Sequence, residues 1–451
     1  MLWPVSAGLF YCLKQNDPKR IKGGIFIEMT IVDSIMGSGK TEAMLETIRK
    51  DKKRRFFFVT PYLREILRVI DSTDGRLKQP PDIGLSKLPF LHELLRKGES
   101  VAVTHVLFLK ATKETEHLIR DGGYTLIIDE TLDVNQDYNE RIKAFDDKTV
   151  KKSEIDWLIK EKLSSVDDRF NLTWNSSETE GFRYSEIVRM SEEGTLRCVD
   201  GSLIWEFPVS VIKAFEKAYV LTYNCRGTVF DSYLKLHGLE YDLLSARRTK
   251  SGAFELCPYA DDLDIRKELS KRISVYEGPY NRIGEKHYDL SVSDLTGMCA
   301  DEIKEVKKCM RNVNNGFGGG SSGLMFTTSM KNDFYHKLEP GGFKYTRRPS
   351  KAELALPEDE QRTFRCFVPC NMRATNDFSD RYKTMFVLNS FLNPVMKKYY
   401  YDLGVPVDEN VYATNLLIQW LWRSRIRLGE QILAYVPSSR MRELLYDWMG
   451  K

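Results

Sequence analysis

The segment from Ser34 to Thr41 has the residue types and the spacing of a loop that binds phosphate groups. It lies between an apolar stretch and a helical pattern, which is the setting that the pattern G-x-x-x-x-G-K-[ST] requires. Glycines in such a loop let backbone N–H groups turn inward around the phosphates. We expect Lys40 to reach the outer phosphates of ATP and Thr41 to bind Mg²⁺. The residues expected to contact the nucleotide are Ser34, which replaces the first glycine of the pattern, Met36, Gly37, Ser38, Gly39, Lys40 and Thr41.

Two adjacent carboxylates, Asp129 and Glu130, directly follow the apolar run Leu126-Ile127-Ile128. We expect Asp129 to hold Mg²⁺ and Glu130 to polarise an attacking water, so the pair favours ATP hydrolysis over binding alone. By itself, such a string is as typical of an ordinary turn at the end of a strand as it is of a catalytic site. Its occurrence together with a phosphate loop favours the catalytic interpretation.

Other segments resemble motifs of the superfamily 2 helicases, the DEAD-like group, and among these the helicases of tailed bacteriophages are most similar. The resemblance covers residues 29 to 440. The matching segments are Phe56-Phe57-Phe58-Val59-Thr60-Pro61, Val103-Thr104-His105, Asp129-Glu130-Thr131, Leu221-Thr222-Tyr223, Phe326-Thr327-Thr328 and Asn371-Met372-Arg373-Ala374-Thr375-Asn376. The third segment is the family's acidic box, and the fourth stands where the family couples hydrolysis to movement.

The resemblance implies a nucleic-acid partner, DNA more than RNA, and a place in the cytoplasm of a bacterial host. It assigns contacts with the nucleic-acid backbone to Thr60, Pro61, Thr104, His105, Thr327 and Thr375. A packed or capping role for His105 is an equally good interpretation.

The last resembling segment, Gln419-Trp420-Leu421-Trp422-Arg423-Ser424-Arg425-Ile426-Arg427, is similar to the motif that closes on ATP from the second domain. Gln419, Arg423 and Arg427 recur every four residues, which predicts one helical face. The family spaces the last two members by three residues, so either Arg423 or Arg427 could stabilise charge on the γ-phosphate. The alternative is an amphipathic helix with solvated arginines and partly buried tryptophans. The catalytic residues expected overall are Lys40, Asp129, Glu130, Gln419, Arg423 and Arg427.

Short apolar runs alternate with helical patterns along the chain, which predicts an α/β fold with parallel strands buried on both faces. The expected elements of the first half are strands at 30–33, 56–60, 101–104, 126–129 and 219–222 and a helix at 40–50. In the second half they are helices at 300–311 and 413–428, a glycine-rich loop at 314–323, and strands at 324–327, 365–368 and 431–436.

Together with the resemblance, this pattern predicts two RecA-like parallel-sheet domains with an inserted subdomain in the first. We expect a dispensable extension over residues 1–28, a first domain over 29–240 with the insertion at 133–215, and a second domain over 241–451. The choice between Met1 and Met29 as the start, the role of the insertion and the oligomeric state stay open.

The composition of the chain limits the functions and sites that can be inferred from it. The net charge of +4 over 451 residues does not indicate nucleic-acid binding by itself. The basic run from Arg49 to Arg55 is typical of a solvated connection. The eight cysteines lack the paired spacing of a metal site or a disulfide framework, so no metal other than Mg²⁺ is expected. The apolar stretch near Val5 is too short to span a membrane and has the wrong flanking charges for a signal peptide.

Three other functions fit parts of the pattern. A phage packaging ATPase shares the phosphate loop and the acidic strand, but residues 240–451 show no run of nuclease-like carboxylates. A nucleotide-gated binding protein without unwinding activity would keep the same motifs. A small-molecule kinase would leave the second α/β region and its arginine segment without a role.

Overall fold

The computed structural model describes residues 27–451 except 83, 85, 144–147, 177–182, 357–359 and 373–376. Most of the expected extension at 1–28 is outside the described residues, but its last two residues belong to the fold. Ile27 is buried, and Glu28 begins the first strand and pairs through its carboxylate with Lys217.

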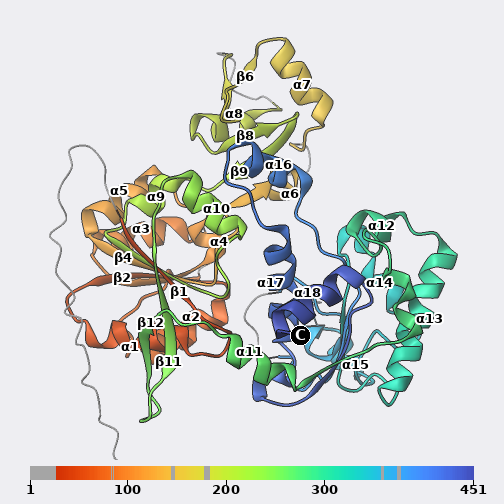
Figure 1. The fold of residues 1–451 in the computed structure, drawn as a ribbon. Coiled ribbons are helices and arrows are strands. Elements are labelled where there is room, and N and C mark those ends of the chain that lie inside the picture. Colours follow the sequence, from red (N-terminus) through yellow and green to blue (C-terminus); the bar gives the residue numbers. More distant parts are fainter. Residues whose placement is uncertain are drawn as a thin grey trace, which may run out of the picture.

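The larger sheet carries the phosphate loop (Figure 1). Its order within the described residues is β12-β11-β1-β10-β4-β2-β3, and all neighbours are parallel except β11 and β12. The strands are β1 (Glu28–Asp33), β2 (Arg55–Thr60), β3 (Val101–Thr104), β4 (Tyr124–Asp129), β10 (Lys217–Thr222), β11 (Asp242–Arg248) and β12 (Phe254–Pro258). The loop strand β1 and the acidic strand β4 are thus separated only by β10.

Helices cover both faces of this sheet, which explains its continuous apolar strands. On one face Met44 of α1 and Ile66 of α2 pack against Phe58. On the other face Leu91 of α3 and Ile119 of α5 pack in the core that contains Phe57. The helices of this part are α1 (Lys40–Lys50), α2 (Leu63–Ser72), α3 (Leu88–Arg96), α4 (His105–Phe108), α5 (Lys113–Gly122), α9 (Val209–Lys213) and α10 (Val229–Leu236).

The hairpin β11–β12 extends the first sheet beyond residue 240, so the boundary expected there from the sequence is wrong. β11 pairs with β1 in parallel, and Ala246 is buried in the core beneath it. We therefore call residues 27–258 the first lobe and residues 259–451 the second lobe.

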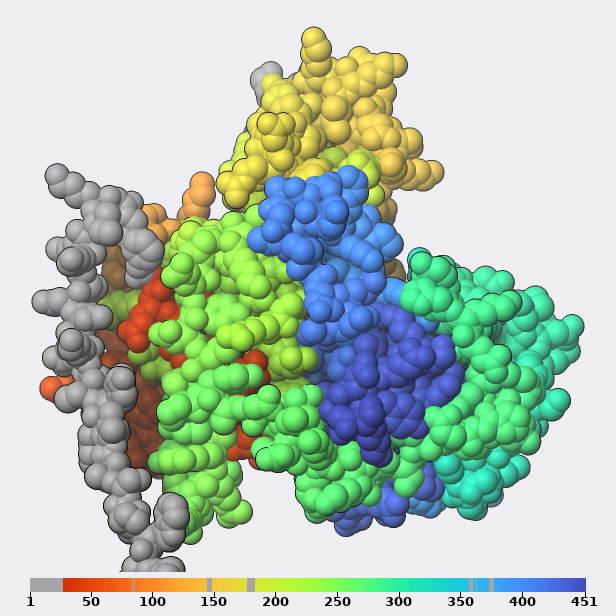
Figure 2. All heavy atoms as spheres, in the orientation of Figure 1, coloured from red at the N-terminus to blue at the C-terminus, as the bar shows by residue number. Residues whose placement is uncertain are grey.

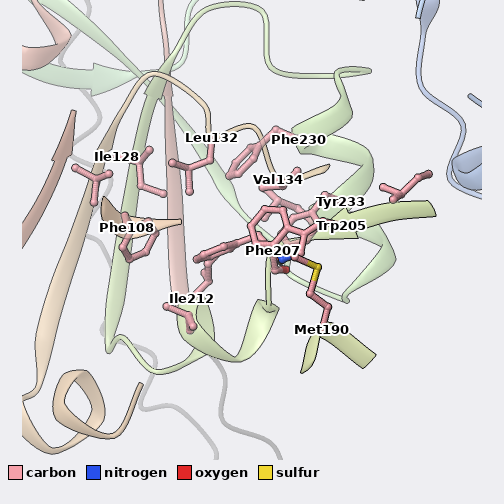
Figure 3. Close-up of a cluster of buried hydrophobic side chains, with 14 of the residues drawn as sticks. Phe108, Ile128, Leu132, Val134, Met190, Trp205, Phe207, Ile212, Phe230 and Tyr233 are labelled. Atoms are coloured by element: carbon pink, nitrogen blue, oxygen red, sulfur yellow. Dashed lines mark hydrogen bonds between the residues drawn. The ribbon is translucent and has the colours of Figure 1, made fainter. Parts of the chain in front are cut away.

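The expected insertion forms a small subdomain between β4 and β10. It contains α6 (Tyr138–Ile142), α7 (Lys152–Lys160), α8 (Ser185–Glu192) and the strands β5 (Asn135–Asp137), β6 (Ser164–Val166), β7 (Leu172–Trp174), β8 (Leu196–Val199) and β9 (Ser202–Glu206). Its apolar core continues into that of the first lobe, as the close-up in Figure 3 shows. Phe207, just after β9, packs against Phe108 of α4 with ring centroids 5.3 Å apart.

The second lobe contains a parallel sheet of order β13-β16-β15-β14. Its strands are β13 (Ile273–Val275), β14 (Leu324–Thr327), β15 (Lys383–Phe386) and β16 (Ile432–Tyr435), and its α-helices are α11 (Leu263–Ser270), α12 (Val292–Gly297), α13 (Ala300–Gly316), α14 (Tyr335–Leu338), α15 (Lys351–Leu354), α16 (Pro394–Asp402), α17 (Glu409–Leu421) and α18 (Ser439–Met449). The α/β class with two largely parallel sheets and an inserted subdomain is confirmed.

Three expected elements of the second lobe are different in the structure. Residues 365–368 do not form the expected strand and touch β14 through one β-bridge only. The backbone bends there, and Pro369, which lacks an N–H, follows. The strand that pairs with β14 is β15. The helix expected at 413–428 ends at Leu421, and a short 3₁₀ turn, Arg425–Leu428, follows it. Helix α13 continues to Gly316, so it includes the start of the expected glycine-rich loop.

Helix α16 belongs to the second lobe by sequence but lies against the insertion (Figures 1 and 2). The buried hydroxyl of Tyr399 donates to Glu206 of β9 at 2.8 Å, and that of Tyr400 donates to Asn135 of β5. The insertion is therefore in contact with both lobes. None of the helices in the described ranges is long and apolar enough to cross a membrane.

Candidate functional site

The loop between β1 and α1 is shaped by two glycines with positive φ. Gly37 has φ 80° and Gly39, the residue before α1, has φ 87°, a region that other residues adopt only with strain. The side chain of Lys40 folds back over the loop, and its Nζ donates to the carbonyl oxygens of Ser34 at 2.5 Å and Ile35 at 3.1 Å. Phosphate oxygens would replace these carbonyls as acceptors for Lys40.

Ser34, which replaces the first glycine of the pattern, has a structural contact of its own. Its Oγ accepts the backbone N–H of Ala246 at 2.9 Å, and its own N–H donates to Thr222 at 3.1 Å. Ser34 therefore joins the loop to strands on both sides of β1.

The two carboxylates at the end of β4 face the start of α1. The hydroxyl of Thr41 donates to Oδ1 of Asp129 at 3.0 Å. Glu130 follows with φ 64°, and its backbone N–H donates to Leu221 of β10 at 2.9 Å. A hydroxyl and a carboxylate held together in this way are the type of oxygen ligands that Mg²⁺ prefers.

Burial shifts the pKa values of charged groups at this site. Burial lowers the pKa of Lys40 to about 8, although the charges of Asp129, Asp33 and Glu130 oppose this. Burial and the neighbouring charge of Glu130 raise the pKa of Asp129 to about 7, against the hydrogen bond from Thr41. Perturbed groups of opposite sign in one cleft are typical of functional sites.

A cavity of about 500 Å³ opens in front of the loop and lies between the lobes. From the first lobe it is lined by the loop, by Asp129 and Glu130, and by Glu65 and Arg68 of α2. From the second lobe it is lined by Gln419, Arg423 and Arg427. The structure thus brings together the loop, the acids and the arginine segment that the sequence singled out.

The prediction that Gln419, Arg423 and Arg427 share one helical face is wrong, because the helix stops before the arginines. Ser424 has an extended backbone, and its hydroxyl caps both sides of the break: it donates to Leu421 at 2.6 Å and accepts the N–H of Ile426 at 3.5 Å. Arg427 reaches the cavity from the 3₁₀ turn that follows.

Several residues of the cavity are not predicted from the sequence. Phe254 of β12 and Trp422 line it, and so does Arg68, whose guanidinium pairs with Glu42 at 2.6 Å and with Glu65 at 2.8 Å. The turn around Gly252 between two short strands was the available signal for the hairpin that carries Phe254. No local pattern pointed to its ring lying over the loop.

Those residues assigned to nucleic-acid contact that belong to the described part of the chain lie outside this cavity, and most of their side chains are covered. Thr60 and Thr327 are fully buried, and the hydroxyl of Thr104 accepts the N–H of Leu107. His105 is 6% exposed, and its Nε2 donates to the carbonyl oxygen of Asp129 at 2.9 Å, which favours the packed interpretation. Pro61 is half-buried. Thr375 lies outside the described residues, as does most of its motif.

Direct hydrogen bonds join the lobes next to the cavity. The loop after β10 contributes Tyr223, whose hydroxyl accepts the indole N–H of Trp448 at 2.8 Å, and Asn224, whose side chain donates to that of Asn415 at 2.8 Å. Asp33 fixes this loop by accepting the N–H groups of Asn224 at 2.7 Å and Cys225 at 2.9 Å. The segment Leu221-Thr222-Tyr223 therefore lies both on the cavity and on the contact between the lobes.

The fold and the site define a two-lobed α/β protein with a phosphate loop and paired acids facing an arginine segment across a cleft. Residues 267–449 match the family model of the YonV C-terminal Rossmann-like domain. The chain is 29% identical over 435 residues to the SPbeta prophage-derived uncharacterized protein YonV of Bacillus subtilis (strain 168), covering 93% of this chain and 98% of that protein. This relative agrees with the resemblance to phage proteins that the motifs indicate.

Two solved structures with a similar chain path are XPD proteins. One, described as XPD_APO, has a TM-score of 0.49 and 12% identity and covers 91% of this chain and 92% of its own. The other, described as XPD_Helicase, has a TM-score of 0.41 and 11% identity, and the match covers 93% of this chain and 90% of that one.

Proposed function

We propose that this chain is an ATP-driven motor that acts on nucleic acid as a helicase or translocase, with DNA as its substrate. The observation that carries the proposal is one cavity between two lobes that contains the phosphate loop, both acids and three polar residues of the arginine segment. A binding protein needs the first of these features, whereas hydrolysis linked to movement uses all of them.

The first step is binding of the triphosphate at the loop. The N-terminus of α1 and the backbone N–H groups around Gly37 and Gly39 attract the phosphates. Lys40 leaves the carbonyls of Ser34 and Ile35 and donates to phosphate oxygens. Thr41 and Asp129 would hold Mg²⁺, which would neutralise charge on the phosphates and align them for attack.

Hydrolysis then depends on Glu130 and on an arginine from the other lobe. Glu130 orients the water and accepts its proton. We assign the γ-phosphate contact to Arg427. Arg423 is 6% exposed and donates to the backbone oxygen of Gln419 in α17 at 2.7 Å, whereas Arg427 lies within the electrostatic reach of Glu65 on the first lobe. A guanidinium that already faces the opposite lobe can meet a phosphate bound there.

Movement follows from changes at the contact between the lobes. Release of phosphate removes the charge that draws Arg427 toward the first lobe, and Tyr223 and Asn224 transmit the change through Trp448 and Asn415. Since the hydroxyls of Thr60 and Thr327 are covered, we propose that the backbone of the turns after β2 and β14 contacts the strand, with little dependence on sequence.

The decisive experiment is the ATPase rate of the full chain with and without single-stranded DNA. Stimulation by DNA that is lost in Lys40→Ala supports the motor. Equal rates with and without DNA and RNA contradict it and leave a nucleotide-binding protein. A strand-displacement assay then separates a helicase from a translocase or a nucleotide-gated binding protein, because neither of the latter displaces a strand.

A further inference from the structure

Two aromatic rings lie directly on the glycines of the phosphate loop, one from each lobe. A Cβ atom at Gly39 would overlap the ring of Phe254, and a Cβ atom at Gly37 would lie 3.3 Å from Cζ2 of Trp422. Both rings are half-buried and line the same cavity as Lys40. Each ring therefore has one side on the loop and another part open to the cavity.

The order of the first sheet determines which end of a nucleotide meets these rings. Asp129 and Thr41, the pair suited to Mg²⁺ and the outer phosphates, lie toward β4. The hairpin β11–β12, which carries Phe254, lies on the opposite side of β1. A triphosphate whose outer end points toward Asp129 must extend its nucleoside away from β4, and the hairpin borders the loop on that side.

Most of the charged residues that line the cavity from the first lobe already have partners within that lobe. Glu42 and Glu65 pair with Arg68, and the acids at the end of β4 face Lys40 and Thr41. On the hairpin itself the guanidinium of Arg248 lies 5.8 Å from the ring centroid of Phe254. The ring of Phe254 thus presents a flat π surface, which binds the face of a base and does not read its edge.

We propose that Phe254 and Trp422 form an aromatic clamp for the base of the nucleoside triphosphate, an inference that rests on the proposed function. The clamp holds the base by stacking. The site therefore binds ATP and GTP with similar affinity and binds the smaller pyrimidine triphosphates more weakly. Because its two rings come from different lobes, the base helps to hold the cleft closed.

The test compares nucleotides with inorganic tripolyphosphate, which has the phosphates and lacks the base. Affinities of the full-length protein for ATP, GTP, CTP, UTP and tripolyphosphate, each with Mg²⁺, are measured by titration calorimetry. We expect Phe254→Ala to weaken ATP binding about tenfold or more, in line with the loss of one stacked base, and to leave tripolyphosphate binding unchanged. Phe254→Tyr keeps the ring and restores ATP affinity. On the second lobe, Trp422→Ala removes the ring and Trp422→Phe keeps an aromatic ring, and we expect the same two results from them.

The outcomes separate the clamp from the proposed function. If the wild-type protein binds no triphosphate at all, the proposed function fails. If it binds ATP no more tightly than tripolyphosphate, or if ATP is preferred to GTP by tenfold or more, the clamp is contradicted and the ATPase stands. An equal loss of ATP and tripolyphosphate affinity in Phe254→Ala would mean that the ring only supports the loop, which also overturns the clamp. Tyr288→Ala, an exposed aromatic substitution on the second lobe, controls for general effects.

Discussion

Ser34 shows how a departure from a motif at one position can have a structural reason. A glycine there would match the phosphate-loop pattern, but the hydroxyl of Ser34 is the acceptor for the buried backbone N–H of Ala246. A buried donor that loses its acceptor costs free energy, about 1–3 kcal/mol.

We therefore expect Ser34→Gly to lower the free energy of unfolding by about 1–2 kcal/mol, even though it restores the pattern. Urea denaturation followed by circular dichroism measures this. Ser38→Gly, in the same loop, is the matched control, because the buried hydroxyl of Ser38 has no hydrogen-bond partner within the described part of the chain. If Ser34→Gly is as stable as the wild type, the contact with Ala246 is unimportant.

Glu130 and Arg427 provide the residue-scale test of chemistry. We expect Glu130→Gln and Arg427→Ala each to lower the ATPase kcat about 100-fold or more, because one removes the base and the other the charge at the γ-phosphate. ATP affinity should change much less. Arg423→Ala is the comparison: a larger loss of kcat there than in Arg427→Ala would reverse the assignment of the two arginines.

Much of the site was visible in the sequence because its parts are local. The loop and the acids are contiguous strings beside apolar strands, so Lys40, Thr41, Asp129 and Glu130 could be assigned roles from pattern alone. Phe254 could not, since its place depends on the pairing of β11 with β1, which is a long-range event. Burial of Thr60 and Thr327 was equally hidden, because a strand-end threonine can face either way.

At the scale of elements, the errors have two physical causes. Strand β15 is not predicted from the sequence because it begins with two polar residues, Lys383 and Thr384. Lys383 is nevertheless buried, with 1% of its surface exposed, and its Nζ donates to the carbonyl oxygens of Gly319 at 2.6 Å and Gly320 at 2.9 Å. The predicted helix over 413–428 is longer than the observed one because the helical pattern of the sequence continues through Ser424. The hydroxyl of Ser424 favours a cap at this point instead.

The strands of the insertion meet helix α16 at a buried charge, Glu206, which is 1% exposed. Burial alone would raise its pKa, but hydrogen bonds from His237 and Tyr399 and the charge of Arg197 lower the pKa to about 2 from a usual 4.5. Because the folded-state pKa is depressed, the ionised carboxylate stabilises the fold above about pH 4.5, and this contribution is lost as the pH falls toward 2.

We expect the difference in unfolding free energy between the wild type and Glu206→Gln to shrink by roughly 3 kcal/mol as the pH is lowered through that range. Denaturant titrations at a series of pH values measure it. Glu193→Gln, at an exposed carboxylate of the same subdomain, should show little change. A difference that is independent of pH would contradict the buried charge network.

At the scale of the whole molecule, α16 makes the insertion part of both lobes. We expect the wild type to unfold in one calorimetric transition, because each part is stabilised by another. Tyr399→Ala combined with Tyr400→Ala removes two buried rings and their hydrogen bonds to Glu206 and Asn135, so the second lobe should then melt in a separate transition.

Tyr401→Ala is the control on the same helix, since this side chain is 71% exposed. It should leave the single transition unchanged. Two transitions already present in the wild type would show that α16 does not couple the lobes.

The position of α16 also limits how the cleft can open. When the hydrogen bonds next to the cavity break, the lobes are still joined by the chain segment after β12 and by the contact of α16 with the insertion. While these two attachments persist, the lobes cannot separate by a straight translation, and they can move apart only by rotating about the line through the two attachments. Opening of the cleft would then be a rotation about one fixed axis, and its direction would be the same in every cycle.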